Sequence, residues 1–291
     1  MKILTAGSNG MIGSAVVCQL TNGGHEALRL VWHAAGPGEI RRDPDAGRIE
    51  AVGLEGFDGV VQLATVPWPM RARILLVLTG GSPIALGEIA DMVEAILFVW
   101  YPGQEGGRAV ASLLFGDAVP SGKLTITFPR ASSDLPPFED YNMAGRTYRY
   151  ATREPLFPFG FGLSYTTFKY LDLKIKSPGA TATGFRASVT LKNTGAVTAN
   201  EVVQLYISAL ESRLSAPLNQ LIGFRRVRLK AGQSKTIQFT VTPEMLMAFD
   251  ENGRQKLESG RFRLTAGGCS PSARGLALDA PQPVSLEFQI P

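Results

Sequence analysis

A glycine-rich segment near the N-terminus has the residue types and spacing of a phosphate-binding loop. It reads GSNGMIG over residues 7–13, between an apolar run that ends at Ala6 and a helical pattern that begins at Met11. Glycine lets the backbone approach a pyrophosphate, and a helix N-terminus attracts negative charge. Gly7, Gly10 and Gly13 are therefore candidate cofactor-binding residues, with NAD(P) as the cofactor if this loop binds one. The alternative is a sharp strand-to-helix turn that binds nothing.

Five carboxylates are the other candidates for chemistry. Glu105 follows a buried-strand pattern in a glycine-rich loop. We expect its carboxylate to be buried and to cap the N-terminus of a helix over residues 106–115, where it would accept backbone N–H bonds. Catalysis by Glu105 is the alternative. The remaining carboxylates are expected in a turn or solvated in a polar loop: Asp117, Asp134, Glu139 and Asp140.

Histidine, cysteine and aromatic residues add little further chemistry. His25 and His33 are the only histidines, and nothing beside them suggests a catalytic triad. Cys18 and Cys269 lie near opposite ends of the chain, so they indicate neither a metal site nor a disulfide framework. Cys18 falls in an apolar helical stretch and is expected to be buried. Two aromatic residues either form a sugar platform or pack a turn: Trp100 and Tyr101.

Strand and helix patterns alternate in the first part of the chain. Apolar runs predict strands at 3–6, 27–32, 60–64, 74–78 and 95–100, with a further alternating strand at 123–128. Helical spacing predicts helices over 11–20, 86–93 and 106–115. The stretch 129–165, rich in proline, glycine and aromatic residues, is expected to be a long ordered loop or a linker.

From residue 168 onward the pattern becomes all-β. Short alternating runs recur at 185–191, 202–207, 222–229, 234–241, 260–265 and 284–290, and turn residues separate them. Six to seven short strands in about 120 residues are typical of a β-sandwich.

The first 65 residues resemble the start of the short-chain dehydrogenase/epimerase superfamily, in which a strand leads into T-G-x-x-G-x-I-G. Ala6 stands where that group usually has threonine, and the group's ribose-reading acid or arginine is replaced by Trp32 and His33. The Tyr165-x-x-x-Lys169 spacing matches the catalytic pair of the reductases, but it lies at the start of the β region and is interpreted as coincidence.

Residues 72–291 resemble the C-terminal half of glycoside hydrolase family 3, the β-glucosidases and β-xylosidases. The motifs occur in the family's order: LVLTGGSP at 76–83, WYPGQEGG at 100–107, LFGD at 114–117, PSGKL at 120–124, TFP at 127–129, GRTYRY at 145–150 and PLFPFGFGLSYT at 155–166. Three further segments resemble the family's fibronectin type III-like domain: VVQLY at 202–206, QLIGFRRV at 220–227 and LKAG at 229–232.

The resemblance implies chemistry that this chain lacks the residues to perform. Retaining β-glycosidases need two carboxylates about 5–5.5 Å apart. In the family the nucleophilic Asp lies on an N-terminal (β/α)8 barrel in a Ser-Asp-Trp or similar motif, and the acid/base Glu of many members lies upstream of the strand that corresponds to residues 74–78. Neither is found here, and Glu105 matches a family glutamate that is not the acid/base. No catalytic and no metal-binding residue is therefore assigned.

We accordingly expect a relative of these glycosidases, which the resemblance places in carbohydrate metabolism. The chain alone is expected to have no hydrolytic activity. A β-linked sugar is its substrate by family only, and another chain could supply the barrel. Two alternatives stay open, namely a non-catalytic interaction module associated with carbohydrate and a nucleotide-binding remnant of an epimerase.

The expected fold class is α/β plus all-β, in a chimera or truncation with three parts. These are a Rossmann-like βαβ fragment at 1–65, a partial α/β domain at 72–165 and a fibronectin type III-like β-sandwich at 166–291. The strands of residues 1–65 are expected to complete a parallel sheet with 74–78 and 95–100, because exposed edges and faces of parallel sheets must be covered.

Composition and charge exclude several classes of protein. The 291 residues are 45% hydrophobic and 19% charged, which excludes wholesale disorder. The formal net charge is +4, with scattered basic residues, so no nucleic-acid partner is expected. Glycine interrupts the N-terminal apolar run too early for a signal peptide, and no run approaches the roughly 20 residues of a membrane helix. The chain is expected in the cytoplasm, away from membranes.

Overall fold

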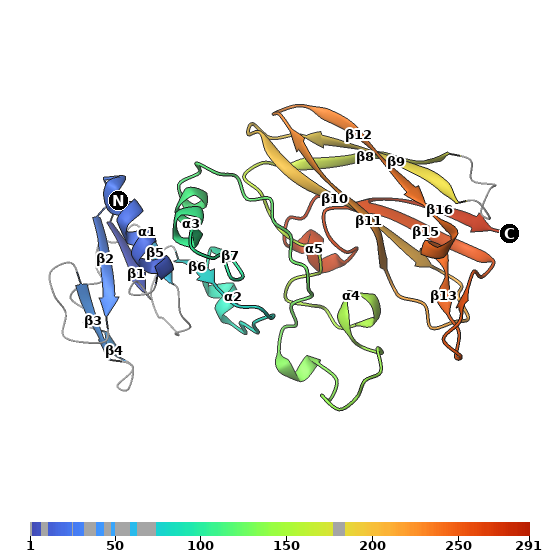
Figure 1. The fold of residues 1–291 in the computed structure, drawn as a ribbon, viewed down its shortest axis with the longest axis horizontal. Helices are drawn as coiled ribbons and strands as arrows, with labels where there is room; N and C mark the ends of the chain where they lie inside the picture. Colours follow the sequence, from blue (N-terminus) through green and yellow to red (C-terminus); the bar gives the residue numbers. More distant parts are fainter. Residues whose placement is uncertain are drawn as a thin grey trace. The chain divides into compact units, whose positions relative to one another are not determined.

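The computed structural model describes residues 2–6, 11–24, 26–31, 39–43, 48–49, 59–62, 74–176 and 184–291. The chain forms two compact units, Met1–Ala118 and Val119–Pro291, and each is described by itself (Figure 1). The three-part division drawn from sequence resemblance stays a prediction.

A largely parallel sheet organises the first unit. Its strands lie in the order β4-β3-β2-β1-β5-β6-β7, and all pairs are parallel except β3 with β4. The strand bounds are β1 Lys2–Ala6, β2 Glu26–Val31, β3 Glu39–Asp43, β4 Arg48–Ile49, β5 Gly59–Gln62, β6 Ile74–Leu78 and β7 Ala95–Phe98.

The pairing of β5 with β6 joins the N-terminal segment to the rest of the sheet. Val60 lies opposite Ile74, and Gln62 lies opposite Leu76. The prediction that residues 1–65 supply strands to one parallel sheet with 74–78 is thus confirmed. The sequence did not predict β3 or β4, whose charged residues break the apolar pattern.

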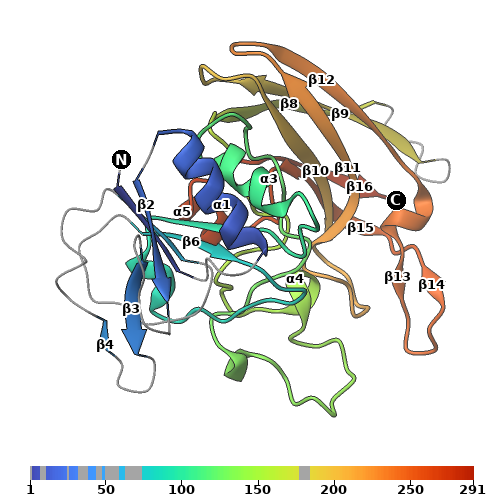
Figure 2. The same ribbon diagram turned by 60° about the vertical axis from the view of Figure 1, so that its left-hand side comes forward.

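Two helices pack together in this unit, namely α1 (Met11–Asn22) and α3 (Gly106–Leu114), and they lie side by side in Figure 2. Val16 and Leu20 of α1 pack with Val110 of α3 and with Val77 of β6. The helix predicted over 86–93 is shorter, because α2 spans only Ile89–Met92.

Cys18 corrects one expectation about burial. It lies in the predicted helix, but its side chain is exposed. Val16, Val17 and Leu20 take the buried positions instead, and a residue that falls between the apolar positions of a helix turns outward.

The second unit contains a two-layer β-sandwich. Within its described residues, one sheet has the order β11-β10-β15-β16 and the other β12-β9-β8. The bounds are β8 Phe168–Lys176, β9 Phe185–Asn193, β10 Ala199–Ala209, β11 Gln220–Leu229, β12 Ser234–Val241, β15 Gly260–Gly267 and β16 Val284–Ile290. Six of these strands fall on the predicted alternating runs, and β8 is a seventh strand at a position for which no run was predicted, so the sandwich of six to seven strands is confirmed.

Alternating side chains of both sheets form the sandwich core. Leu191 of β9, Leu205 of β10, Leu229 of β11 and Leu264 of β15 are almost completely buried in it. A short hairpin, β13 (Ala248–Phe249) with β14 (Gln255–Lys256), and the helix α5 (Ala273–Ala277) complete the part described.

The strand predicted over residues 123–128 is not formed. This segment runs beside residues 157–161 as irregular chain, with one isolated bridge between Phe128 and Phe157. Leu124 N donates to Phe161 O at 2.8 Å, and Gly160 N donates to Leu124 O at 2.7 Å. The segment therefore bonds to the irregular chain at 157–161 instead of to a strand.

The expected long loop over residues 129–165 is ordered. It holds a 3-10 turn at Ser132–Asp134 and the short helix α4 at Thr147–Tyr150. No helix among the residues described is long and apolar enough to cross a membrane.

Candidate functional site

The glycine loop is only partly within the described residues. Gly7 and Gly10 lie outside them, and so do Trp32 and both histidines. Gly13 lies in the first turn of α1, which follows β1 as expected of a strand–loop–helix unit. Cofactor binding by these three glycines stays a prediction.

Glu105 lies at the N-terminal end of α3 as predicted, but its side chain does something else. The carboxylate is exposed and makes no capping hydrogen bond. The buried residues at this end are Gly106 and Gly107, so it is glycine rather than the carboxylate that packs here. The expectation of a buried capping carboxylate was wrong.

The acidic residues of the loops divide into two groups. Asp117 and Glu139 are exposed, and Asp117 lies in the predicted turn. Asp134 accepts from Ala131 N and from Arg153 Nη1 at 3.1 Å. Asp140 accepts from both the backbone and the side-chain nitrogen of Asn142. Asp134 and Asp140 therefore form hydrogen bonds within the loop, whereas Asp117 and Glu139 are solvated.

The aromatic pair after β7 is held by its neighbours. The ring of Trp100 meets that of Phe98 edge to face at 4.7 Å, and Trp100 has a φ of 54°, a region that favours glycine. The ring of Tyr101 lies where a Cβ on Gly81 would come within 2.8 Å of it, yet Tyr101 is largely exposed. Packing of the turn accounts for Trp100, while Tyr101 keeps a solvent-exposed face.

The Tyr165-x-x-x-Lys169 spacing does not form a helical pair. Tyr165 precedes β8, and Lys169 is an exposed residue within that strand. Residues four apart share a face on a helix, but in a strand the same spacing separates them by about 13 Å. This agrees with the interpretation of the match as coincidence.

A buried ion pair lies where the loop segments meet the sandwich. Lys123 Nζ lies 3.0 Å from Glu201 Oε1, and the two side chains are only 10% and 3% exposed. Lys123 also donates to Gly162 O at 2.7 Å. Tyr170 OH donates to the same carboxylate oxygen at 3.1 Å. Three segments distant in the sequence are thereby fixed to one another.

Burial controls the titration of this cluster. It raises the pKa of Glu201 above its usual value, while Lys123 and the hydrogen bond from Tyr170 act in the opposite direction. Burial also raises the pKa of Tyr170, with the Glu201 charge adding to the effect. The pKa of the Cys269 thiol rises to about 11, mainly through burial, so this thiol is protonated and unreactive at neutral pH.

A second buried group explains the glycines of the 155–166 motif. Gln204 Nε2 donates to Gly160 O at 3.0 Å and to Gly268 O at 2.7 Å, and Tyr206 OH donates to Gln204 Oε1. Gly160 has a φ of 77°, and a Cβ there would lie 2.1 Å from Gln204 Oε1. Only glycine fits this position. The motif is therefore a structural joint.

The loop 131–146 presents several large apolar side chains to solvent. The Arg146 guanidinium donates to the carbonyls of Asn142, Pro137 and Asp140, which ties the loop to its own centre. Around this centre four large apolar side chains are exposed: Leu135, Phe138, Tyr141 and Met143.

Sequence reasoning missed the interior partners of these motifs. It quoted Lys123 within PSGKL and Gln204 within VVQLY, but assigned a role to neither. It did not single out Glu201 or Tyr170. A lysine in a glycine-rich segment and a glutamate beside a buried strand were the available signals, but their pairing spans 78 positions of sequence.

Chemically, the cluster orders structure and offers no open reaction site. Within the described residues no group of three or more His, Cys, Asp and Glu side chains could hold a metal ion. The buried carboxylate of Glu201 is bound by Lys123 and Tyr170.

Comparison with known proteins places this architecture. Residues 68–165 match the glycosyl hydrolase family 3 C-terminal domain, and residues 201–270 match the fibronectin type III-like domain. A xylan 1,4-beta-xylosidase of Xylanibacter ruminicola is 41% identical over 67% of this chain and 22% of its own length. A periplasmic beta-glucosidase of Salmonella typhimurium is 38% identical over 67% of this chain and 27% of its own length.

Solved structures of β-glucosidases are also similar to this chain. A beta-glucosidase of Kluyveromyces marxianus in complex with glucose is 32% identical, with a TM-score of 0.64 over 75% of this chain and 27% of its own. A beta-glucosidase of Listeria innocua has the same fold, with a TM-score of 0.75 at 23% identity over 99% of this chain and 46% of its own. That likeness extends through the N-terminal strands.

These matches define a C-terminal α/β domain with a fibronectin type III-like domain. The chain is a relative of the family 3 β-glucosidases and β-xylosidases, corresponds to the C-terminal part of those enzymes, and lacks the catalytic barrel. It spans between 22% and 30% of the length of the curated relatives it matches. Neither family match includes residues 1–67, so the epimerase resemblance there stays a prediction.

Proposed function

We propose that this chain is the non-catalytic, C-terminal part of a β-glucosidase- or β-xylosidase-type enzyme and that hydrolysis requires a catalytic barrel. The barrel would be supplied by further sequence or by another chain. The substrate would be a β-linked glycoside, as the names of the relatives indicate for those proteins.

The state of the described carboxyl groups carries this proposal. A retaining glycosidase needs an open pair of carboxylates, one of which acts as an acid with a raised pKa. Burial raises the pKa of the Glu201 carboxyl, as an acid of this kind would need. Its side chain is 3% exposed and bound by Lys123 and Tyr170, which leaves no space for a sugar.

The loop 131–146 is the surface that we assign to the barrel. Phe138 and Tyr141 are 87% and 88% exposed, although the hydrogen bonds of Arg146 and Asp140 hold the loop in one conformation. A rigid loop that keeps large apolar side chains in water is typical of an interface lacking its partner. The barrel is the partner argued for, since it is the large part of the relatives that this chain does not match.

The experiment is a hydrolysis assay on aryl β-glucosides and β-xylosides. The chain alone should give no turnover. The N-terminal, barrel-bearing part of a family 3 β-xylosidase should gain at least tenfold in activity when the chain is added. Robust turnover by the chain alone would refute the argument from the carboxyl groups, and a barrel indifferent to the chain would refute the accessory role.

A matched variant tests the remaining catalytic alternative. Glu105→Gln removes one exposed carboxylate without changing its size. We expect the stimulated activity to stay within twofold of the unaltered chain. A loss of 100-fold or more would assign Glu105 a catalytic part.

We also propose the glycine loop of residues 7–13 as a dinucleotide site. Two observations support it. The loop connects β1 to α1, and β2 and β5 lie on opposite sides of β1 in the sheet, so the strand order reverses direction at β1. Ligands of parallel α/β sheets bind at such a switch point, beyond the carboxyl ends of the strands. Calorimetric titration with NAD(H) and NADP(H) without a heat change would remove this proposal.

A further inference from the structure

A cationic hollow lies at one end of the β-sandwich, apart from the buried Lys123–Glu201 pair and from the loop 131–146. It has a volume of about 370 Å³, at the small end of the range of about 300–1,000 Å³ for ligand sites. Its lining comes from two turns and the end of one strand: Thr198, Arg228, Lys230 and Gln233.

One buried side chain holds the two walls of this hollow together. Asn193 is completely buried, and its Nδ2 donates to Val197 O at 2.8 Å and to Leu229 O at 3.3 Å. Val197 precedes Thr198 on one wall, and Leu229 lies between the two cationic residues of the other. The side-chain oxygen of Asn193 accepts from Thr166 Oγ1 and Gly195 N. The walls are therefore set by the fold.

The second turn is preorganised as well. Gln233 N donates to Lys230 O at 3.1 Å, and Lys230 N donates to Gln233 Oε1 at 2.9 Å. Gly232 supplies the positive φ of 72° that this turn requires. Because the amide oxygen of Gln233 is engaged within the turn, its N–H groups are the part directed to a ligand. A rigid wall lowers the entropy lost on binding.

The charge at this end of the sandwich is uncompensated. Residues 224–235 contain five cations and no acidic residue: Arg225, Arg226, Arg228, Lys230 and Lys235. None of the ion pairs in the described part of the chain includes Arg228 or Lys230.

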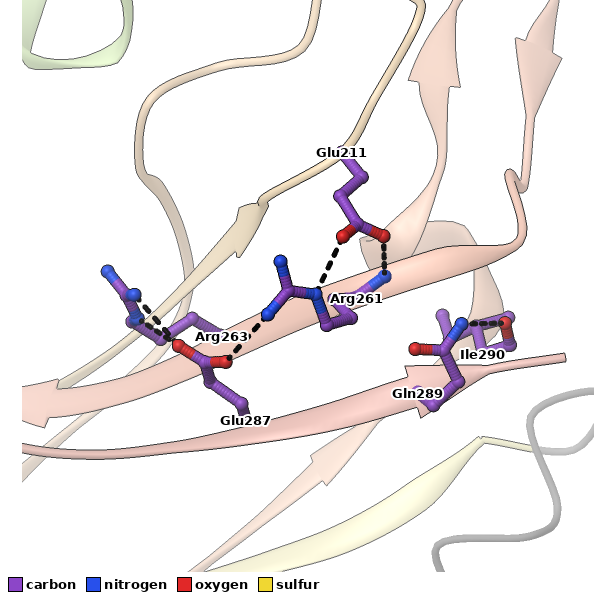
Figure 3. Close-up of polar contacts among 6 residues, drawn as sticks. All are labelled: Glu211, Arg261, Arg263, Glu287, Gln289 and Ile290. Atoms are coloured by element: carbon purple, nitrogen blue, oxygen red, sulfur yellow. Dashed lines mark hydrogen bonds and ion pairs between the residues drawn. The ribbon is translucent and has the colours of Figure 1, made fainter.

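The arginines near the other end of the same sheet are neutralised, as Figure 3 shows. Arg261 Nε lies 2.7 Å from Glu211, and Arg263 Nη2 lies 2.8 Å from Glu287. On β10, Arg263 is opposite Ser208 and Arg228 is opposite Asn200, so the two ends are about 26 Å apart. The cations of the hollow, in contrast, have no ion-pair partner among the described residues and stay available to an anionic ligand.

We propose that this hollow binds the carboxylate of a uronic acid on an acidic glycan. Arg228 would receive the carboxylate through its paired N–H donors, with Lys230 as the second charge. The Thr198 hydroxyl and the Gln233 N–H groups would bond to sugar hydroxyls. The proposal rests on the proposed function only for the choice of glycan, because that enzyme would act on β-linked glycosides, whose polymers can carry acidic branches.

The lining argues against a nucleic acid as the occupant. Single-stranded nucleic acids are held by aromatic side chains that stack on bases, and none of the described residues that line the hollow is aromatic. A hydroxyl and an amide beside two cations suit a ring with one carboxylate and several hydroxyl groups.

The experiment is isothermal titration of the full chain with xylo-oligosaccharides that do or do not carry a glucuronic acid branch. The branched form should bind at least tenfold more tightly, with an affinity that falls as salt rises. Arg228→Gln with Lys230→Gln should abolish this preference, and Thr198→Val should weaken binding a few-fold. The control Lys174→Gln with Lys176→Gln removes the same number of positive charges from two exposed positions of β8. These positions lie at the end of β8 that is remote from Asn193 and the hollow, so this variant should bind normally.

Three results would overturn the site. The control variant could lose as much affinity as the variant of the hollow, which would indicate diffuse charge. The unbranched sugar could bind equally well. A DNA duplex could bind as tightly and depend on the same two residues, which would make the surface a general polyanion site. Because binding is measured without hydrolysis, failure of the proposed enzyme function leaves all of these outcomes readable.

Discussion

Lys123 and Glu201 form the most consequential pair of side chains in the second unit. Glu201 lies on β10 among positions that otherwise carry apolar residues of the core, such as Ala199 and Val203. A carboxylate in this place is tolerated because a lysine and a tyrosine satisfy it. Transfer of an unpaired charge to such a site is expensive, so the pair matters mainly for what its disruption would cost.

Lys123→Met should lower the free energy of unfolding by about 3–5 kcal/mol, because it leaves the Glu201 carboxylate buried without its partner. The double variant Lys123→Met with Glu201→Gln should regain part of this loss, since no charge stays buried. Urea unfolding followed by circular dichroism measures both.

The exposed pair of Arg130 and Glu154 gives the matched control. Arg130→Gln should change the free energy of unfolding by about 1 kcal/mol or less. Equal losses for Lys123→Met and Arg130→Gln would contradict the role assigned to the buried pair.

At the scale of elements, the loop 131–146 differs from the strands around it. Its conformation comes from hydrogen bonds of Arg146, Asp140 and Asp134 rather than from burial of its apolar residues. Order without burial leaves Phe138 and Tyr141 available to a partner. The segment with Gly160 and Gly162 differs from this loop, because it is held by buried hydrogen bonds. Gln204 donates to Gly160 O, and Lys123 donates to Gly162 O.

Phe138→Ala with Tyr141→Ala should leave the free energy of unfolding within about 0.5 kcal/mol, as for other exposed substitutions. It should reduce the stimulation of a barrel fragment at least tenfold, because the contact surface is lost. Kinetic titration of the barrel with the chain measures this effect.

Phe249→Ala is the control, because Phe249 is an exposed aromatic residue outside the loop, on the β13–β14 hairpin. It should leave stimulation unchanged. A double variant at 138 and 141 that stimulates like the unaltered chain would separate this loop from the barrel.

At the scale of the whole molecule, the second compact unit begins at Val119, well before the first strand of the sandwich. The residues between them supply Lys123 to Glu201, Gly160 to Gln204 and Leu156 O to Arg274. The segment is therefore folded with the sandwich in the second compact unit, and the match to the family 3 C-terminal domain also runs through it, to residue 165.

A fragment of residues 119–291 should fold cooperatively, whereas 166–291 should be less stable by several kcal/mol. The shorter fragment removes Lys123 from the Glu201 carboxylate and Gly160 O from Gln204 Nε2, and a buried polar group that loses a partner costs about 1–3 kcal/mol. Urea unfolding of the two fragments compares them. Equal stability would show that the 119–165 segment is a passive linker.

Local pattern alone determined much of this fold. Six of the seven strands of the sandwich, the buried strand at 74–78 and the helix after Glu105 follow from the spacing of apolar residues, because burial of one face imposes a period on neighbouring residues. The order of short motifs indicated the family. The pairing of β5 with β6 followed from the need to cover a parallel edge.

Long-range packing decided the rest. An alternating pattern at 123–128 became irregular chain, because its backbone partners are Phe157 and Phe161 rather than another strand. Glu105 turned outward and Cys18 was exposed because neighbouring residues took the buried positions. The sequence by itself determined the elements and the family, since those depend on neighbours along the chain. Only the tertiary structure decided that Lys123 meets Glu201 and that Asn193 joins the walls of the cationic hollow, since those contacts form between segments that folding alone brings together.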